Sequence, residues 1–188
     1  MPKCGEIKTW HWAHEAVRDC DPWYEPETEW HRSWKAHAPE ERVEVTMGPH
    51  RADIVGSDGG VIELQHSSIG PDEIRDREAF YGRMVWLIDG SPFAENLRVT
   101  IDARQCRFVW AHARPSWLAA AAPKFVHGFS LGRYVRKVVP PMPRPQWVWC
   151  ESGRSDAILQ IRSIEAKRYV QGVGRIIEIE RFVERMIG

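Results

Sequence analysis

The segment HRADIVGSDGGVIELQHS, residues 50–67, predicts a β-hairpin. Ala52–Val55 and Val61–Leu64 are rich in β-branched residues, and the turn-forming sequence SDGG lies between them. Polar side chains interrupt both apolar strands, at Asp53, Glu63 and Gln65. Because residues two apart share one face of a strand, Glu63 and Gln65 point the same way. An acid on one strand facing Glu-x-Gln on its neighbour can hold a divalent metal, since hard cations prefer carboxylate oxygens.

The length of the hairpin loop determines whether Asp53 can meet Glu63. A two-residue loop of Asp58-Gly59 pairs residue 53 with 64 and puts the two acids on opposite faces. A three-residue loop, Asp58-Gly59-Gly60, pairs 53 with 65 and 55 with 63, so that the three polar side chains converge. Two glycines suit the longer loop, which needs positive φ. The alternative interpretation is an edge hairpin whose acids are solvated.

Length and composition narrow the class of protein. The 188 residues suffice for one core, or for one domain with a small appendage. No segment approaches the ~20 apolar residues of a membrane helix, so we expect no membrane partner. The amino terminus has no apolar signal region, and four cysteines without such a signal indicate a reducing compartment. We therefore expect a cytoplasmic protein.

Charge is distributed unevenly along a chain whose net charge is zero. Residues 1–97 carry 10 Lys/Arg against 19 Asp/Glu, and residues 98–188 carry 16 against 7. An acidic half able to hold a metal and a basic half able to meet phosphate would suit an enzyme of nucleic acid. Within the basic half, a predicted strand combines cations with an aromatic ring and is suited to phosphate contact and base stacking: Arg133, Tyr134, Arg136 and Lys137. An exposed edge strand protected by charge is the alternative.

The first twenty residues contain a possible zinc site. Its ligands would be Cys4, His11, His14 and Cys20, in the spacing C-x6-H-x2-H-x5-C. Thiolate and imidazole form the donor set that favours tetrahedral Zn²⁺, and a metal would replace the core that so short a segment lacks. The alternative is that the aromatic side chains of this segment pack on the domain without a metal.

A helix should precede the hairpin, from about Glu27 to His37, after Pro26 and before Pro39. Spacing of four residues puts Glu27, His31 and Lys35 in one row, with Glu29 off that row. Such an acidic helix beside the hairpin could supply a further metal ligand or position a water. An ordinary amphipathic helix with a solvated row of ion pairs is the alternative.

The remaining pattern predicts an α/β fold. Arg42–Met47 should be a strand, and a helix from residue 71 to about Gly82 should lead to a buried strand at Met84–Ile88, parallel to its neighbour. Further strands are expected at Val99–Ile101, Arg107–Ala111, Lys124–Phe129, Arg133–Val139 and Gln146–Cys150, with Gly128 and Gly132 bounding a hairpin turn. Pro115–Ala122 should be a short helix, and the apolar stripe over residues 176–186 predicts a helix at the end of the chain.

Four short motifs, in this order, resemble the competence protein CoiA family. They are ETEWH at residues 27–31, HRADI at 50–54, IELQHS at 62–67 and REAFYG at 77–82. The upstream WHWAH, residues 10–14, resembles the zinc-bearing segment before that family's nuclease domain. The acids of the hairpin likewise resemble the PD-(D/E)xK nuclease motif, with Gln65 where most members carry lysine. The resemblance covers roughly residues 4–90.

The resemblance implies a restriction-endonuclease-like core, a mixed sheet with flanking helices, over residues 25–97. A small zinc-binding appendage at 1–24 would precede it, and a basic β-rich extension at 98–188 would complete the domain and end in a helix. Asp53 and Glu63 would hold Mg²⁺ or Mn²⁺, with a helix acid from Glu27 or Glu29. Gln65 would take the lysine position, although an amide cannot supply the cation that lysine offers.

Together these features predict metal-dependent hydrolysis of DNA phosphodiester bonds, in DNA processing or recombination alongside competence or recombination partners. The candidate catalytic residues are Asp53, Glu63, Gln65, Glu27, Glu29 and His31. Gln65 would orient a water by hydrogen bonding. The alternatives are a non-catalytic or weakly catalytic DNA-binding adaptor with a nuclease-like fold, and a purely structural zinc-stabilised protein.

Overall fold

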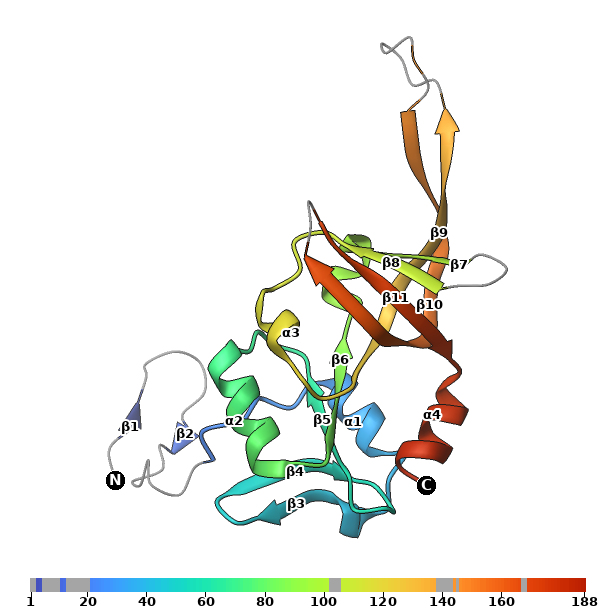
Figure 1. Ribbon diagram of the computed structural model, residues 1–188. Helices are drawn as coiled ribbons and strands as arrows, with labels where there is room; N and C mark the ends of the chain where they lie inside the picture. Colours follow the sequence, from blue (N-terminus) through green and yellow to red (C-terminus); the bar gives the residue numbers. More distant parts are fainter. Residues whose placement is uncertain are drawn as a thin grey trace.

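A mixed sheet is the scaffold of the chain in the computed structural model (Figure 1). The structure describes residues 3–4, 11–12, 21–101, 106–137, 144, 146–166 and 169–188. The strands of the sheet are β3 (Val43–Met47), β4 (His50–Val55), β5 (Val61–Gln65), β6 (Met84–Asp89), β7 (Leu97–Ile101), β8 (Cys106–Trp110), β9 (Lys124–Lys137), β10 (Gln146–Ala166) and β11 (Val170–Ile177). The helices are α1 (Glu29–Lys35), α2 (Pro71–Tyr81), α3 (Ser116–Ala119) and α4 (Ile179–Met186), with 3₁₀ turns η1 (Glu40–Arg42) and η2 (Ser91–Asn96).

The order of the nine strands across the sheet is β10-β11-β8-β7-β9-β6-β5-β4-β3. Two short strands, β1 (Lys3–Cys4) and β2 (His11–Trp12), pair separately and place Cys4 opposite His11. The expected mixed α/β class is confirmed. Among the described residues, no helix has the length and apolar character needed to cross a lipid bilayer.

The crossover from β5 through α2 to β6 forms the centre of the sheet. Both strands are buried at every position, as expected of parallel strands covered on two faces. Helix α2 begins at Pro71, where the missing N–H costs nothing, and ends before Gly82, which has a φ of +64°. The parallel register runs from Val61 opposite Met84 to Gln65 opposite Ile88. The predicted parallel pairing is confirmed.

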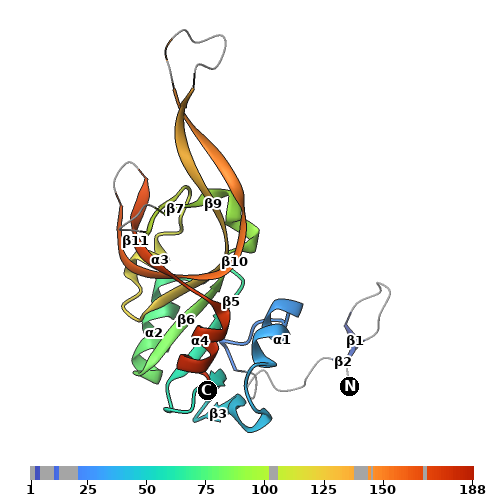
Figure 2. The same cartoon turned by 90° about the vertical axis from the view of Figure 1, so that its right-hand side faces the viewer.

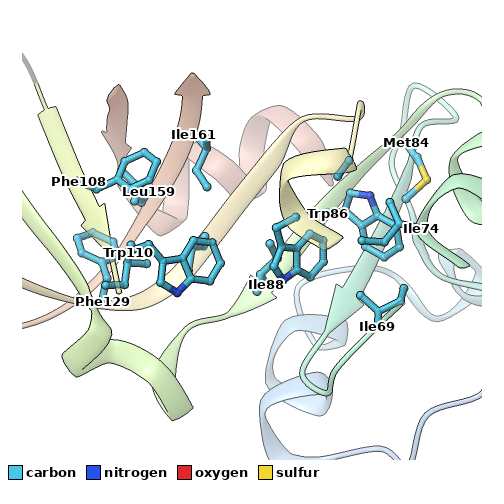
Figure 3. Close-up of a cluster of buried hydrophobic side chains, with 14 of the residues drawn as sticks. Ile69, Ile74, Met84, Trp86, Ile88, Phe108, Trp110, Phe129, Leu159 and Ile161 are labelled. Atoms are coloured by element: carbon cyan, nitrogen blue, oxygen red, sulfur yellow. The ribbon is translucent and has the colours of Figure 1, made fainter. Parts of the chain in front are cut away.

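Alternate residues of the central strands point to opposite faces and build two apolar clusters. One cluster contains Trp86 and extends along the sheet to Phe108, Phe129 and Leu159 (Figure 3). The other contains Leu87, Ile54 and Ile62, and it is covered by α1 and α4. The ring of Phe182 on α4 lies 5.0 Å from that of Phe125 and 5.7 Å from that of Trp34. The helix predicted at the end of the chain is therefore docked on the second face.

The predicted hairpin turn at Gly128 and Gly132 is wrong, because β9 runs through both glycines without reversing. A Cβ on Gly128 would lie 2.7 Å from Ser91 Oγ, and one on Gly132 would lie 2.4 Å from the carbonyl oxygen of Cys150. Gly132 lets neighbouring backbone approach a continuous strand, and Gly128 has a φ of +78°, so each glycine has a reason other than a turn. Gln146–Cys150 is likewise only the start of a longer strand, β10.

The long strands β9 and β10 form an arm. Beyond Leu131, β9 pairs only with β10 within the described part of the chain. Both views show this two-stranded ribbon leaving the body of the molecule (Figures 1 and 2). We call Gly132–Lys137 together with Gln146–Glu151 the arm.

The buried face of β10 should carry much of the stability of the fold. Ile158 is fully buried among β9, β10 and α4, whereas Ile101 keeps 62 % of its surface exposed. We expect Ile158→Ala to lower the free energy of unfolding by about 2–5 kcal/mol, because it leaves a cavity. The matched change Ile101→Ala should cost less than about 0.5 kcal/mol. Urea denaturation of both variants measures the difference, and equal losses would contradict this placement of β10.

Candidate functional site

The hairpin of β4 and β5 closes on a three-residue loop. Gly56 N–H donates to the carbonyl of Gly60 at 2.9 Å, and Gly59 adopts a φ of +78°. The loop is therefore Ser57-Asp58-Gly59, one residue earlier than either loop considered from the sequence. Ile54 pairs with Ile62 and Val55 with Val61, so the proposed pairing of residue 53 with 65 is wrong. The parity is nevertheless that of an odd loop, and it puts Asp53 on the same face as Glu63.

The two strands part at Asp53. Its Oδ2 accepts a hydrogen bond from the backbone N–H of Leu64 at 2.9 Å, where a carbonyl of β4 would otherwise continue the ladder. A cavity of about 60 Å³ opens there, between β4, β5, α1 and the segment that precedes α1. Asp53 and Glu63 both line it, and so do Glu27, His31 and Lys35 from the helical side. Parting of the strands thus gives the two acids a common cavity.

Glu63 is buried next to a guanidinium. Its Oε2 accepts a hydrogen bond from Nη1 of Arg77 on α2 at 2.8 Å, and its side chain is 3 % exposed. Burial and the nearby charge of Asp53 raise the pKa of Glu63 to about 7, although Arg77 acts in the opposite direction. Its other oxygen, Oε1, is buried and has no hydrogen-bond partner among the described residues. The local cations therefore do not fully satisfy this carboxylate.

Asp53 meets Lys35, the last residue of α1. The ammonium lies 3.2 Å from Asp53 Oδ1 and also pairs with Glu27 and with Glu44 on β3. Burial alone would lower the pKa of Lys35, but Glu44 and Asp53 raise it above its usual range, so this lysine is charged. Burial raises the pKa of Asp53 despite Lys35. Glu44 itself has a φ of +54°, uncommon for a residue other than glycine.

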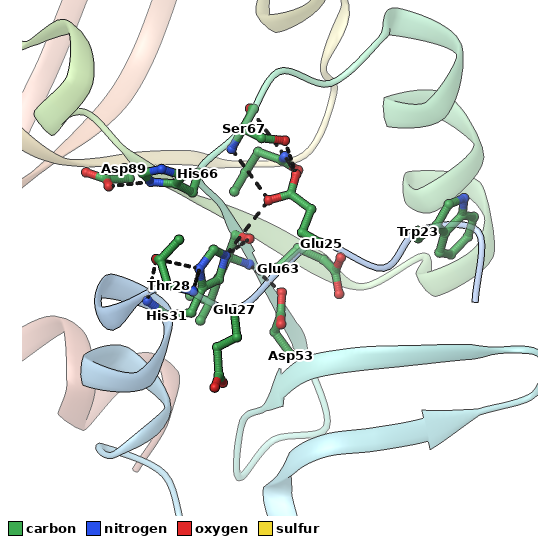
Figure 4. A network of polar contacts seen from close by, with 12 residues as sticks. Trp23, Glu25, Glu27, Thr28, His31, Asp53, Glu63, His66, Ser67 and Asp89 are labelled. Atoms are coloured by element: carbon green, nitrogen blue, oxygen red, sulfur yellow. Dashed lines mark hydrogen bonds and ion pairs between the residues drawn. The ribbon is translucent and has the colours of Figure 1, made fainter. Parts of the chain in front are cut away.

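Gln65 lies two residues beyond Glu63 and is 1 % exposed. Its Nε2 donates to Glu25 and, at 3.3 Å, to the carbonyl of Ser67. Glu25 also accepts from Ser67 Oγ at 2.6 Å and lies 3.9 Å from His31 Nε2 (Figure 4). The amide oxygen of Gln65 is buried and has no hydrogen-bond partner among the described residues. Two oxygens that share one face of β5 are thus left with open acceptor positions.

His31 ties α1 to β5. Its Nδ1 lies 2.8 Å from Thr28 Oγ1 in a capping box, and its Nε2 lies 3.2 Å from the carbonyl oxygen of Leu64. Both ring nitrogens therefore have partners, which suits a positioning residue better than a free base. Glu27 reaches the cavity and pairs with Lys35, whereas Glu29 is exposed and does not line the cavity. Of the two helix acids, Glu27 is the one near Asp53 and Glu63.

Three charged residues at the site were missed or left open by sequence reasoning. The sequence pattern places Lys35 only in a helical row and Arg77 only within the REAFYG motif, and it assigns Glu25 to no site. Their partners are remote in the chain, so local spacing could not reveal them. The sequence does contain one indication of Lys35. Gln65 stands where the nuclease motif usually has lysine, so another residue would have to supply the positive charge.

The remaining predicted site residues are divided between the arm and the amino terminus. Arg133, Tyr134, Arg136 and Lys137 all lie on the arm, away from the cavity (Figure 2). His14, Cys20 and the side chains of Cys4 and His11 lie outside the described residues. Within the described ranges, no cluster of three or more His, Cys, Asp or Glu side chains is arranged to hold a metal ion.

Comparison with known proteins found no matching family model, no matching curated protein and no matching solved structure. A function for this chain is therefore proposed from the geometry of the site.

The raised pKa of Glu63 should make stability depend on pH. An unfolded glutamate titrates near 4.3, so between about pH 4.3 and 7 the folded chain keeps a proton that the unfolded chain has released. Stability of the wild type therefore falls as pH rises through this window. Glu63→Gln removes that loss. In a chelator, its unfolding free energy relative to wild type should rise by about 1–3 kcal/mol from about pH 5 to about pH 8.

Urea denaturation at the two pH values measures this difference. Glu29→Gln is the matched control, because that glutamate is exposed and outside the cavity, and its difference from wild type should not change with pH. A Glu63→Gln variant whose stability relative to wild type is the same at both pH values would show that this carboxyl titrates normally.

Proposed function

We propose that this chain is a metal-dependent phosphodiesterase of DNA, with a CoiA-like nuclease core of the PD-(D/E)xK type. The observation that carries the proposal is a pair of carboxylates in one cavity, Glu63 buried and Asp53 half-buried. Both have raised pKa values, and Glu63 Oε1 and Gln65 Oε1 have no hydrogen-bond partner among the described residues. Burying acids without full compensation is costly, and it is typical of sites that need the charge.

The donor set fits a hard divalent cation in part. Asp53 and Glu63, which line the cavity, offer oxygen ligands of the kind that Mg²⁺ and Mn²⁺ prefer; Gln65 is on the same face of β5 but does not line the cavity. These protein ligands are too few to surround a metal ion completely. Mg²⁺ sites of phosphoryl-transfer enzymes usually include waters and substrate oxygens as the remaining ligands. Bound there, the ion would supply a water of lowered pKa and would neutralise charge on phosphoryl oxygens.

Lys35 supports the proposal because it provides the cation that Gln65 lacks. Its ammonium is charged, is nearly buried and lies 3.2 Å from Asp53. A fixed positive charge at that place would stabilise negative charge developing on a phosphate. Gln65 is held by Glu25 and can orient a water through its free amide oxygen. His31 would keep α1, and hence Lys35, against β5.

The basic half and the amino terminus complete the proposal. The cations of the arm, Arg133, Arg136 and Lys137, would contact the phosphates of DNA without specifying sequence. We also propose a structural zinc on Cys4, His11, His14 and Cys20. The antiparallel pairing that sets Cys4 opposite His11 brings two of these positions together. Thiolates and imidazoles are the donors that zinc prefers.

A second candidate function is a DNA-binding adaptor that has lost catalysis. The observation in its favour is that cations already accompany both acids, with Lys35 at Asp53 and Arg77 at Glu63. Such pairs could be a purely structural network. The raised pKa of both acids, and the open oxygen of Glu63, favour the enzyme.

Cleavage of labelled single- and double-stranded DNA in Mn²⁺, with a chelator as the blank, separates the two candidates. Asp53→Asn and Glu63→Gln should each lower the rate at least about 100-fold, because each removes a metal-holding charge. DNA affinity in the chelator should be unchanged. Glu29→Gln, an acid of α1 outside the cavity, is the matched control and should cleave as the wild type does. If the wild-type protein binds DNA but does not cleave it in Mn²⁺, the nuclease is excluded and the DNA-binding adaptor remains as the function.

The same assay tests the lysine. Lys35→Met should lower the cleavage rate by about 10- to 1,000-fold, as removal of a charge-stabilising donor does. Gln65→Lys should retain or raise activity, since Glu25 can pair with the new ammonium. The double variant should recover much of the activity lost in Lys35→Met. Full activity of Lys35→Met would show that this lysine serves only the fold.

A further inference from the structure

The arm is a regular antiparallel ribbon whose register fixes what each face presents. Lys137 pairs with Gln146, Arg136 with Trp147, Tyr134 with Trp149 and Arg133 with Cys150. Residues directly opposite each other in an antiparallel pair point to the same face, and neighbours along a strand point to opposite faces. The arm therefore has two faces of different chemistry.

One face is aliphatic and basic, and the other is aromatic and basic. The first presents Arg133, Val135, Lys137, Gln146, Val148 and Cys150, and the second presents Tyr134, Arg136, Trp147 and Trp149, with the pair Gly132 and Glu151 at its base. The four residues predicted as one DNA-binding strand are thus divided between the faces. Beyond that pair at the base, three of the four residues of the second face are aromatic, and two of those come from β10, which holds none of the residues predicted to bind DNA.

The aromatic face is organised by contacts between rings and guanidinium groups. Arg136 lies over the ring of Trp147 at 5.9 Å, and Arg98 on β7 lies over Trp149 at 5.8 Å. The rings of Tyr134 and Trp149 are 5.1 Å apart and tilted by 59°. Trp147 nevertheless keeps 68 % of its surface exposed, more than the other large apolar side chains found exposed in the described residues. An indole held by an arginine and open to solvent is ready to receive another flat group.

The charge of the arm points to an anionic partner. Arg133, Arg136 and Lys137 form no ion pair with any residue in the described ranges. The one acid of the arm, Glu151, accepts a hydrogen bond from Ser130 at 2.8 Å at the base of the ribbon. Cations without ion-pair partners, with Arg136 beside the exposed ring of Trp147, match a ligand that alternates phosphate with flat bases.

We propose that the aromatic face of the arm binds single-stranded DNA, with bases stacked on Trp147 and on the Tyr134–Trp149 pair. Arg136 and Arg98 would meet the phosphates between those bases. In a duplex the faces of the bases are covered by their neighbours and only edges reach the grooves, so exposed rings gain little from it. The inference rests on the proposed function for the identity of the nucleic acid as DNA. It adds that the substrate is a strand with unpaired bases.

Fluorescence anisotropy in a chelator tests the arm without cleavage. The probes are an oligothymidine of about 20 nucleotides, an abasic strand of equal length and charge, and a duplex of the same length. Wild-type protein should bind the oligothymidine about 10-fold or more tighter than the abasic strand, and tighter than the duplex. Trp147→Ala should weaken binding of the oligothymidine until its affinity is close to that of the abasic strand. Val148→Ala, the next residue on the opposite face, is the matched control and should bind as the wild type does.

Each other outcome overturns the inference. Equal binding of the oligothymidine and the abasic strand would mean contact with phosphates alone. Tighter binding of the duplex would mean that the ribbon enters a groove of the DNA. If no probe binds, the arm does not bind DNA, and a protein partner would be the alternative. These failures are distinct from failure of the nuclease, because binding is measured without metal. Binding lost in Trp147→Ala but present in Asp53→Asn would support the arm even if wild-type protein cleaves nothing.

Discussion

The hydrogen bond from the Leu64 N–H to the Asp53 carboxylate is the contact on which the site depends. It replaces a link of the backbone ladder and so ends the pairing of β4 with β5. The strands can then separate without leaving a buried N–H unsatisfied, which would cost free energy comparable to a lost hydrogen bond. Asp53 and Glu63 line the resulting cavity, and His31 and Lys35 of α1 line it from the other side. The same residue therefore shapes the cavity and supplies its charge.

Charge balance in the cavity is incomplete. Lys35 and Arg77 each accompany one acid, yet burial keeps the pKa of both Asp53 and Glu63 above the usual range. A buried ion pair gains stability only when its geometry and its remaining hydrogen bonds are satisfied, and Glu63 Oε1 has no such bond within the described residues. Under the proposed function, a divalent cation would supply the charge that balances these acids. The network thus makes sense as a preorganised site more readily than as a stabilising core.

Local pattern predicted the elements around the site, but not the contacts between them. Alternation in residues 50–67 predicted the hairpin, and two glycines favoured an odd loop, but the position of that loop and the register were wrong. The buried strand after α2 predicted the parallel pairing. The meeting of Lys35 with Asp53 depends on how α1 approaches the sheet, which no local spacing encodes. Gly128 led to the wrong prediction of a turn, because the sequence alone does not distinguish a glycine that allows a close contact in a strand from one that makes a turn. Likewise, the faces of the arm follow only from the partner strand, β10.

Mn²⁺ binding to the protein without DNA tests most directly whether this cavity is a cation site. The account predicts stoichiometric Mn²⁺ binding by isothermal titration at about pH 8, weaker at about pH 6 because protons compete for Glu63. Asp53→Asn should abolish it. Zinc bound elsewhere would not respond to that substitution. Wild-type protein that takes up no Mn²⁺ at either pH, or an Asp53→Asn variant that binds it equally, would contradict the account and leave the acids as a structural network.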